Sequence, residues 1–354
     1  MISETEFFTK IIEKYSDINH DPIKIELLKS NAIRELMEVH SNKGKQDFFE
    51  GWYFKVADKK AENVFAFIPG VFQSESKNNE HAFIQVLDGR KNESFFIKYS
   101  FDKFRAAQDR FFIEIENNKF SKEEIILDIK VKDIKIKGKL NFHNLNPWPV
   151  DILSPGAMGW YGFIPFMECN HGVLSFTHEI TGDLKVNSEA IDFDKGKGYL
   201  EKDWGSSFLS AWLWLQTNHF NEKSSSLMVS IATIPWLSRE FRGFIIGFHH
   251  KDQLYKFTTY NNTKINKFQK NKEIIEIEVE NKGYKLYIKA NYKEGTLLKG
   301  PFRTEMVENV EESLQAIIEV KLVEKATNKI ITEDKGKKAG FELNGNLEEI
   351  IDNF

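Results

Sequence analysis

The pattern of apolar and polar positions changes at about residue 46 of the chain. Before it, apolar residues recur at helical spacing over residues 7–15 and again over residues 25–37. Asp21-Pro22 offers an N-cap followed by a proline at the first helical position. The polar residues 41–46 read as a linker. We therefore expect a helical extension over residues 1–44.

After residue 46 the apolar period falls from about 3.6 to 2, which is the signature of β-strands. The clearest example is a hairpin, in which residues 274–280 and 284–290 flank the turn Asn281-Lys282-Gly283. Shorter alternating runs cover residues 111–116, 125–141, 317–323 and 330–332. A meander of short strands is typical of an antiparallel barrel or sandwich.

A weak internal repeat suggests how these strands are grouped. A Trp-bearing strand, a polar turn and an apolar strand ending in Pro occur at residues 50–69 and again at residues 212–235. The offset of about 160 residues is the size of one small β-barrel domain. The pattern predicts two antiparallel β-barrel domains, over residues 45–190 and 191–354.

Composition excludes several classes of protein. The 354 residues are 41% hydrophobic and 29% charged, as in a globular chain, and the net charge of −4 without blocks of like charge argues against a nucleic-acid partner. Cys169 is the single cysteine, so we expect a buried structural thiol and a reducing compartment. The acidic start and the lack of a long apolar run predict a cytoplasmic protein. Because no phosphate-loop, dinucleotide or zinc motif occurs, we expect no cofactor and no metal.

Candidate chemistry begins in the stretch from Gly198 to Phe220. In extended chain, Tyr199, Glu201 and Asp203 share one face, whereas Lys202 and Trp204 lie on the other. Two close carboxyls cannot both ionise cheaply, so one should keep its proton near neutral pH, and Lys202 points away from the pair. Glu201 and Asp203 are therefore candidate catalytic acids.

Further along, Trp212, Trp214, Gln216 and Asn218 share a face. Two indoles followed by two amides suit the inside of a ligand-binding barrel, and we favour ligand lining for the two Trp residues.

Trp52 and Trp204, with Glu50 beside the first, leave two interpretations open. They either contact the ligand or close the barrel ends as plugs, with Glu50, Lys202 and Asp203 in plain ion pairs.

A third aromatic cluster covers residues 158–171 and contains Trp160, a further candidate for contact with the ligand. If residues 166–172 form a strand, Glu168 shares a face with Phe166 and Asn170. Burial among aromatic rings would raise its pKa and make Glu168 a third candidate acid. A salt bridge to one of the many Lys residues is the equal alternative.

Four segments together resemble the tocopherol cyclase family. They are "FFEGWYFKV" (Phe48–Val56), "GYLEKDWGSSF" (Gly198–Phe208), "WLWLQTNHF" (Trp212–Phe220) and "GTLLKGP" (Gly295–Pro301). The resemblance implies a mainly β fold of two lipocalin-like barrels, similar to carotenoid hydratase-type proteins. It also implies cofactor-free, acid-catalysed closure of a prenylated hydroquinone to a chroman, with Trp faces stabilising a carbocation. The implied partner is a small apolar isoprenoid or prenylated quinol, with peripheral membrane contact during uptake left open.

One position departs from the family pattern. Plant members carry Asn where this chain has Asp203, so Glu201 is the safer candidate acid. Alternatively, Asp203 marks a different reaction, such as hydration or isomerisation of an isoprenoid. Two non-catalytic alternatives also stay open: a lipid or quinone carrier, and a stress or interaction protein whose barrel is only a scaffold.

Overall fold

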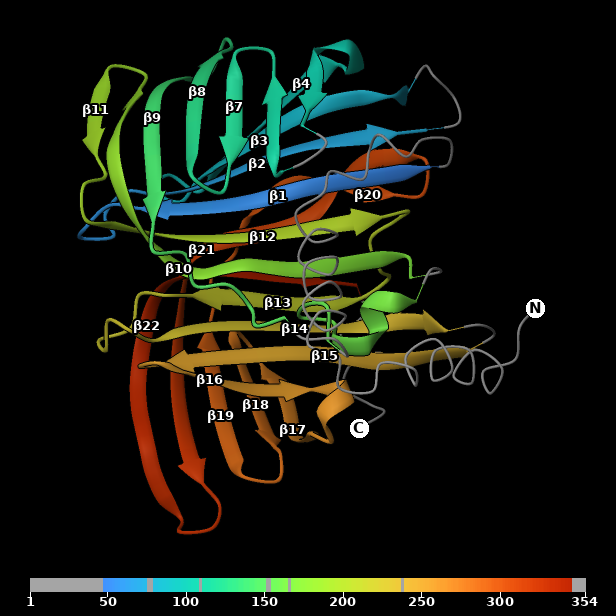
Figure 1. The fold of residues 1–354 in the computed structure, drawn as a ribbon, viewed down its shortest axis with the longest axis vertical. Coiled ribbons are helices and arrows are strands. Elements are labelled where there is room, and N and C mark those ends of the chain that lie inside the picture. Colours follow the sequence, from blue (N-terminus) through green and yellow to red (C-terminus); the bar gives the residue numbers. More distant parts are fainter. Residues whose placement is uncertain are drawn as a thin grey trace, which may run out of the picture.

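The computed structural model describes residues 47–74, 79–107, 110–150, 154–164, 167–236 and 239–345. These residues form two large antiparallel sheets, one in each half of Figure 1. The helical extension predicted for residues 1–44 lies outside the described residues. No helix within the described ranges is long and apolar enough to cross a membrane.

The first sheet has the strand order β4-β3-β2-β1-β12-β10-β9-β8-β7-β6-β5, and β11 pairs with β10. Its strands are β1 (Phe48–Ala57), β2 (Val64–Gln73), β3 (His81–Asp88), β4 (Glu93–Ser100), β5 (Phe104–Ala106), β6 (Phe112–Ile115), β7 (Asn118–Ser121), β8 (Glu124–Lys130), β9 (Lys135–His143), β10 (Cys169–Val186), β11 (Glu189–Asp192) and β12 (Gly196–Gly205). Two 3₁₀ turns interrupt it, η3 (Phe101–Lys103) and η4 (Gly159–Phe163).

The second sheet has the order β16-β15-β14-β13-β22-β21-β19-β18-β17, and β20 pairs with β21. Its strands are β13 (Trp212–Thr217), β14 (Ser226–Trp236), β15 (Arg239–His250), β16 (Gln253–Thr258), β17 (Lys264–Asn271), β18 (Ile274–Glu280), β19 (Tyr284–Asn291), β20 (Thr296–Phe302), β21 (Glu305–Glu324) and β22 (Lys329–Asn344), with the 3₁₀ turn η5 (Thr259–Asn261) after β16.

The two sheets share one plan. In each, a central strand (β1 or β13) pairs on one side with the next strand in sequence, beyond which the following two strands are added in order. On the other side it pairs with the last strand of its sheet (β12 or β22). The repeat predicted from sequence corresponds to β1–β2 and β13–β14, which hold the same place in the two sheets. The chain passes between sheets after Gly205, so the predicted domain boundary at residue 190 falls inside β11 of the first sheet.

Period-2 patterning accounts for the outer strands. In β18, Ile275, Ile277 and Val279 are buried and alternate with half-buried neighbours. The β18–β19 hairpin closes as predicted, because the side-chain oxygen of Asn281 accepts the backbone N–H groups of Gly283 and Tyr284 at 2.9 and 2.8 Å. By contrast, the predicted short strands at 317–323 and 330–332 are parts of the much longer β21 and β22, in which bulges interrupt the alternation.

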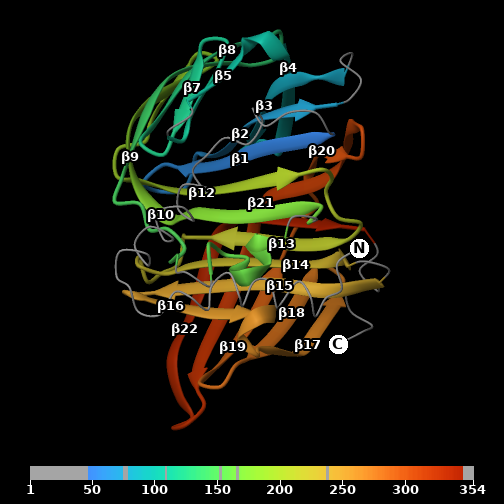
Figure 2. The same cartoon turned by 45° about the vertical axis from the view of Figure 1, so that its right-hand side comes forward.

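The apolar side chains form three cores. One is shared by strands of the first sheet, one is shared by strands of the second sheet, and the third lies between the two sheets. The third core includes Tyr53 and Tyr199 from the first sheet, and Trp212, Trp214 and Met228 from the second. In both ribbon views β1, β12 and β10 lie above β13, β14 and β15 across the middle of the molecule (Figures 1 and 2). The sheets therefore meet along their central strands, while their outer strands curve away toward opposite ends.

An ion pair is buried inside the first sheet. Nζ of Lys202 lies 2.7 Å from Oε1 of Glu50, and both side chains have no exposed surface. The same ammonium lies 4.7 Å from the ring centroid of Trp204 and 5.6 Å from that of Trp52. Lys202 points away from Glu201 and Asp203, as the strand alternation predicts. A buried ion pair of this kind is costly to break from one side.

We expect Lys202→Met to lower the free energy of unfolding by about 3–5 kcal/mol, because Glu50 would keep a buried charge without the ammonium that balances it. The double variant Glu50→Leu/Lys202→Met should recover most of this loss, since no charge is left buried. Urea denaturation followed by circular dichroism measures both effects.

The control is Lys137→Met, which removes an exposed pair with Asp128 at 3.5 Å and should change stability by less than about 1 kcal/mol. A double variant as unstable as Lys202→Met would contradict the account of this ion pair.

Candidate active site

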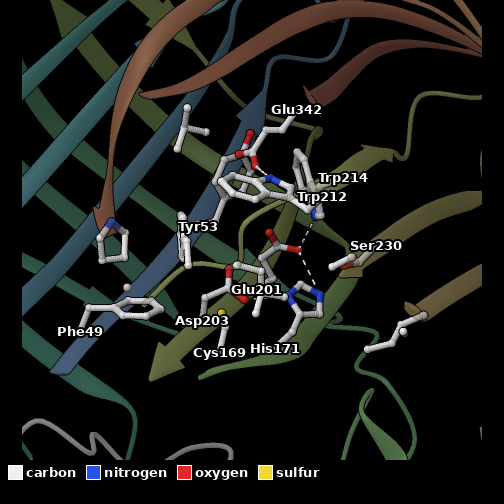
Figure 3. A pocket seen from close by; sticks show the side chains of 18 of the residues that line it. Phe49, Tyr53, Cys169, His171, Glu201, Asp203, Trp212, Trp214, Ser230 and Glu342 are labelled. Atoms are coloured by element: carbon white, nitrogen blue, oxygen red, sulfur yellow. Dashed lines mark hydrogen bonds and ion pairs between the residues drawn. The ribbon is translucent and has the colours of Figure 1, made fainter. Parts of the chain in front are cut away.

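A pocket opens between the two sheets and is lined by both. It encloses about 1350 Å³ of empty space, part of which is open to solvent. Its walls are largely apolar and include Phe49, Phe83, Phe208, Phe244, Ile245 and Leu298. Polar side chains also line it, among them Glu201, Asp203, His171 and Glu342 (Figure 3). A large apolar pocket with a few convergent polar groups is the usual form of a site for an apolar ligand.

Glu201 on β12 is the most deeply buried carboxyl of the pocket wall, with 4% of its surface exposed. The hydroxyl of Tyr199, on the same strand face, donates to Oε2 at 2.5 Å, and Nε1 of Trp214 donates to the same oxygen at 3.1 Å. Burial raises the pKa of Glu201 to about 8, with Asp203 raising it further while His171 lowers it. The carboxyl is therefore mostly protonated at neutral pH.

His171 on β10 stands between the two carboxyls. Register places it opposite Asp203, and its Nδ1 lies 2.8 Å from Oδ1 of Asp203, while its Nε2 lies 3.6 Å from Oε2 of Glu201. Burial lowers the pKa of His171, but the charges of Asp203 and Glu201 outweigh it, so that the pKa rises to about 9. Lys202 points away from the carboxyl pair as predicted, and the cation that faces the pair is His171, which arrives from the neighbouring strand. At neutral pH the wall holds an imidazolium–carboxylate pair beside a neutral acid.

Each of the two Trp side chains of β13 donates a hydrogen bond to a carboxyl group. Trp214 donates to Glu201 on the first sheet, and Nε1 of Trp212 donates to Oε2 of Glu342 on β22 at 2.9 Å. Both Trp residues line the pocket, as predicted from their shared strand face. Close packing fixes Trp214, since a Cβ added at Gly340 on β22 would lie 2.6 Å from its ring.

The polar end of the same strand face does not line the pocket. Gln216 is fully buried and accepts a hydrogen bond from Nζ of Lys55 at 2.9 Å. Asn218 follows the end of β13 and donates to the backbone oxygen of Gly198 at 2.8 Å. Burial lowers the pKa of Lys55 to about 7, against the opposing effect of Glu312. Gln216 and Asn218 therefore join the two sheets, and their predicted contact with a ligand has no support from the geometry.

The remaining predicted site residues lie outside the pocket. Glu50 and Trp52 are buried inside the first sheet, where Trp52 stacks on Phe111 with centroids 5.4 Å apart. Trp204 packs against that same core, which favours the plug interpretation for both Trp residues. Trp160 on η4 stacks on Tyr161, which does line the pocket, at 3.9 Å.

Glu168 is exposed. The strand at residues 166–172 on which its burial depended is not formed at this position, because β10 begins only at Cys169 and Glu168 precedes it in a bend. Cys169 itself lines the pocket, and burial raises the pKa of its thiol, which makes the thiolate scarce.

One group of metal-binding side-chain types occurs among the described residues. One ligand atom from each of His171, Glu201 and Asp203 lies within 4.8 Å of the others. Hydrogen bonds within the protein account for this closeness. His171 is hydrogen-bonded to Asp203, and Tyr199 and Trp214 donate hydrogen bonds to Glu201. We assign no metal to this group, and the expected absence of a metal stays a prediction.

Sequence reasoning missed His171 and Glu342 as site residues. Both sit at alternating positions of long strands, so the period-2 pattern identifies their faces. Nothing in the pattern shows which strands bring them beside Glu201 or Trp212.

Two plant proteins match part of the chain. It is 28% identical over 158 residues to the probable chloroplastic tocopherol cyclase of Oryza sativa subsp. japonica, and 28% identical over 111 residues to the chloroplastic tocopherol cyclase of Zea mays. These matches span 40% and 30% of this chain, but only 31% and 23% of the plant proteins. The cytoplasmic location expected for this chain stays a prediction.

A solved structure shares the fold at low identity. The crystal structure of CghA with Sch210972 superposes with a TM-score of 0.56 at 8% identity, covering 85% of this chain and 89% of that one. The likeness confirms the predicted mainly β, lipocalin-like class and carries nothing about activity.

The tocopherol cyclase-like family model matches residues 131–345, which include β10, β12, β13 and β22 and so most of the polar wall of the pocket. Because this match covers more than half of the 354 residues, the chain belongs to the tocopherol cyclase-like family.

Proposed function

We propose that this protein binds an apolar isoprenoid or prenylated hydroquinone between its two sheets and closes a ring by protonating an alkene. One observation carries the proposal. Glu201 is a carboxyl whose pKa is raised to about 8 by burial, and it lines a pocket with apolar and aromatic walls. A carboxylic acid that stays neutral at pH 7 can act as a general acid.

The chemistry needs only a proton and a shaped pocket. Glu201 gives its proton to the less substituted carbon of a trisubstituted alkene, and the tertiary cation forms at the other carbon. A phenolic oxygen of the same molecule attacks the cation, a C–O bond forms, and the proton lost from that oxygen returns to the Glu201 carboxylate. The product is an isomer of the substrate, so no oxidant or reductant is consumed.

The pocket also suits the cationic intermediate. Trp212 and Trp214 offer aromatic surface to it, and such contacts are worth about 2 kcal/mol or more when desolvated. The imidazolium of His171 would repel a cation if it stood alone, but Asp203 lies 2.8 Å away and balances its charge. The family and its plant relatives support the substrate class.

We expect Glu201→Gln to lower turnover of a methylhydroquinone bearing a trisubstituted prenyl alkene by about 10²–10⁴-fold, because the amide has no proton to give. Binding, followed by quenching of Trp fluorescence, should persist. Asp203→Asn should be milder, since Asn stands there in plant members of the family. Chromatographic assay of the cyclised product measures these effects.

The matched control is Glu168→Gln, which alters an exposed carboxyl outside the pocket and should leave turnover unchanged. Full turnover in Glu201→Gln would remove Glu201 as the acid. A ligand that the native protein binds and returns unchanged would instead indicate a carrier.

The rate should also fall as the pH rises through about 8, where Glu201 loses its proton. The sign follows from a raised pKa: the active protonated form is complete well below 8 and disappears above it. The pH at which the rate falls depends on Glu201 and His171 together, because their charges interact. A pH–rate profile measures it, and the residual activity of Glu201→Gln should lack this decrease. A rate that rises with pH across this range would contradict acid catalysis.

A further inference from the structure

Glu201 and Glu342 hold equivalent positions in the two sheets. Glu201 pairs with Tyr53 across β12 and β1, and Glu342 pairs with Trp214 across β22 and β13. In both sheets, therefore, a carboxyl on the last strand stands opposite an aromatic residue on the central strand. Both carboxyls line the same pocket. The shared plan thus gives the pocket two acidic groups, of which the proposed acid step uses only one.

The surroundings of Glu342 differ from those of Glu201. Glu342 is half-buried, and Trp212 donates to its Oε2 at 2.9 Å. Glu312, its pairing partner on β21, also hydrogen-bonds Glu342. A carboxylate can accept about four hydrogen bonds, so these two contacts leave capacity for a ligand group. Burial raises the pKa of Glu342 to about 7. In Figure 3 Glu342 lies beyond the indole rings from His171 and Asp203.

We propose that Glu342, held by Trp212, is a second polar subsite that binds a hydroxyl group of the ligand as a hydrogen-bond acceptor. This deepens the proposed function and rests on it: the ligand would carry a hydroxyl-bearing ring at one end and its alkene near Glu201. A hydroxyl donor suits the position because it satisfies the carboxylate without bringing a second charge into an apolar pocket. The arrangement separates the group that gives a proton from the group that orients the oxygen.

The test uses two ligands that cannot react, because their side chains are saturated. One is a decylhydroquinone, and the other is its dimethyl ether, which has no donor hydroxyl. Affinities are measured by quenching of Trp fluorescence at pH 7.5. We expect the native protein to prefer the hydroquinone by about tenfold to a hundredfold, the range for a hydrogen bond to a charged acceptor. Glu342→Met, which lacks an acceptor, should abolish this preference, and Glu342→Gln should reduce it severalfold.

Two further variants separate this role from a structural one. Trp212→Phe keeps a ring and the carboxyl but removes the N–H that holds Glu342, so the preference should weaken without disappearing. Glu201→Gln should keep the preference, because neither ligand has an alkene. This readout is independent of turnover, so loss of the acid hypothesis would leave it intact. If Glu342→Met does not fold, the proposal is tested by whether Glu342→Gln has a reduced preference for the hydroquinone over its dimethyl ether.

Three results would overturn the proposal. One is a preference that survives in the Glu342 variants, and another is a preference that disappears equally in Glu201→Gln. The third is failure of the native protein to bind the hydroquinone or to distinguish it from its ether.

Discussion

The candidate site depends on the burial of one carboxyl, Glu201, where two sheets meet. Only 4% of the surface of Glu201 is exposed, and Tyr199 and Trp214 both donate hydrogen bonds to the same oxygen. Burial outweighs the opposing charge of His171, so the pKa of Glu201 rises to about 8. Either sheet alone would leave this carboxyl nearer to solvent and more acidic. The raised pKa of Glu201 therefore depends on the interface between the two sheets.

The same interface contains polar groups that serve the fold. Lys55 bonds Gln216 across the sheets, and Asn218 bonds the backbone of Gly198. Tyr53 on the first sheet donates to Glu312 on the second. Such bonds satisfy buried polar groups and set how the two sheets are oriented. Because these bonds keep the two sheets from sliding, the pocket between them keeps its shape before a ligand binds.

The alternation of apolar and polar residues was sufficient to predict the strands and the face of the sheet on which each side chain lies. Tyr199, Glu201 and Asp203 share a face as the period of 2 requires, and Lys202 lies on the opposite one. Proximity between strands was not accessible in this way: His171 reaches Asp203 only through the pairing of β10 with β12. Glu168 is exposed and is not buried among aromatic residues, because β10 begins one residue after it. Gln216 and Asn218 were placed on the correct face, but the cavity does not extend past Trp214 along that strand.

The central claim is that Glu201 carries a proton at neutral pH, and infrared difference spectroscopy tests it without any substrate. Subtracting the spectrum of Glu201→Gln from that of the native protein should reveal the carbonyl stretch of a protonated carboxylic acid at pH 7. This band should fade as the pH rises through about 8. A difference spectrum that shows only ionised carboxylate at pH 6 and above would contradict the account.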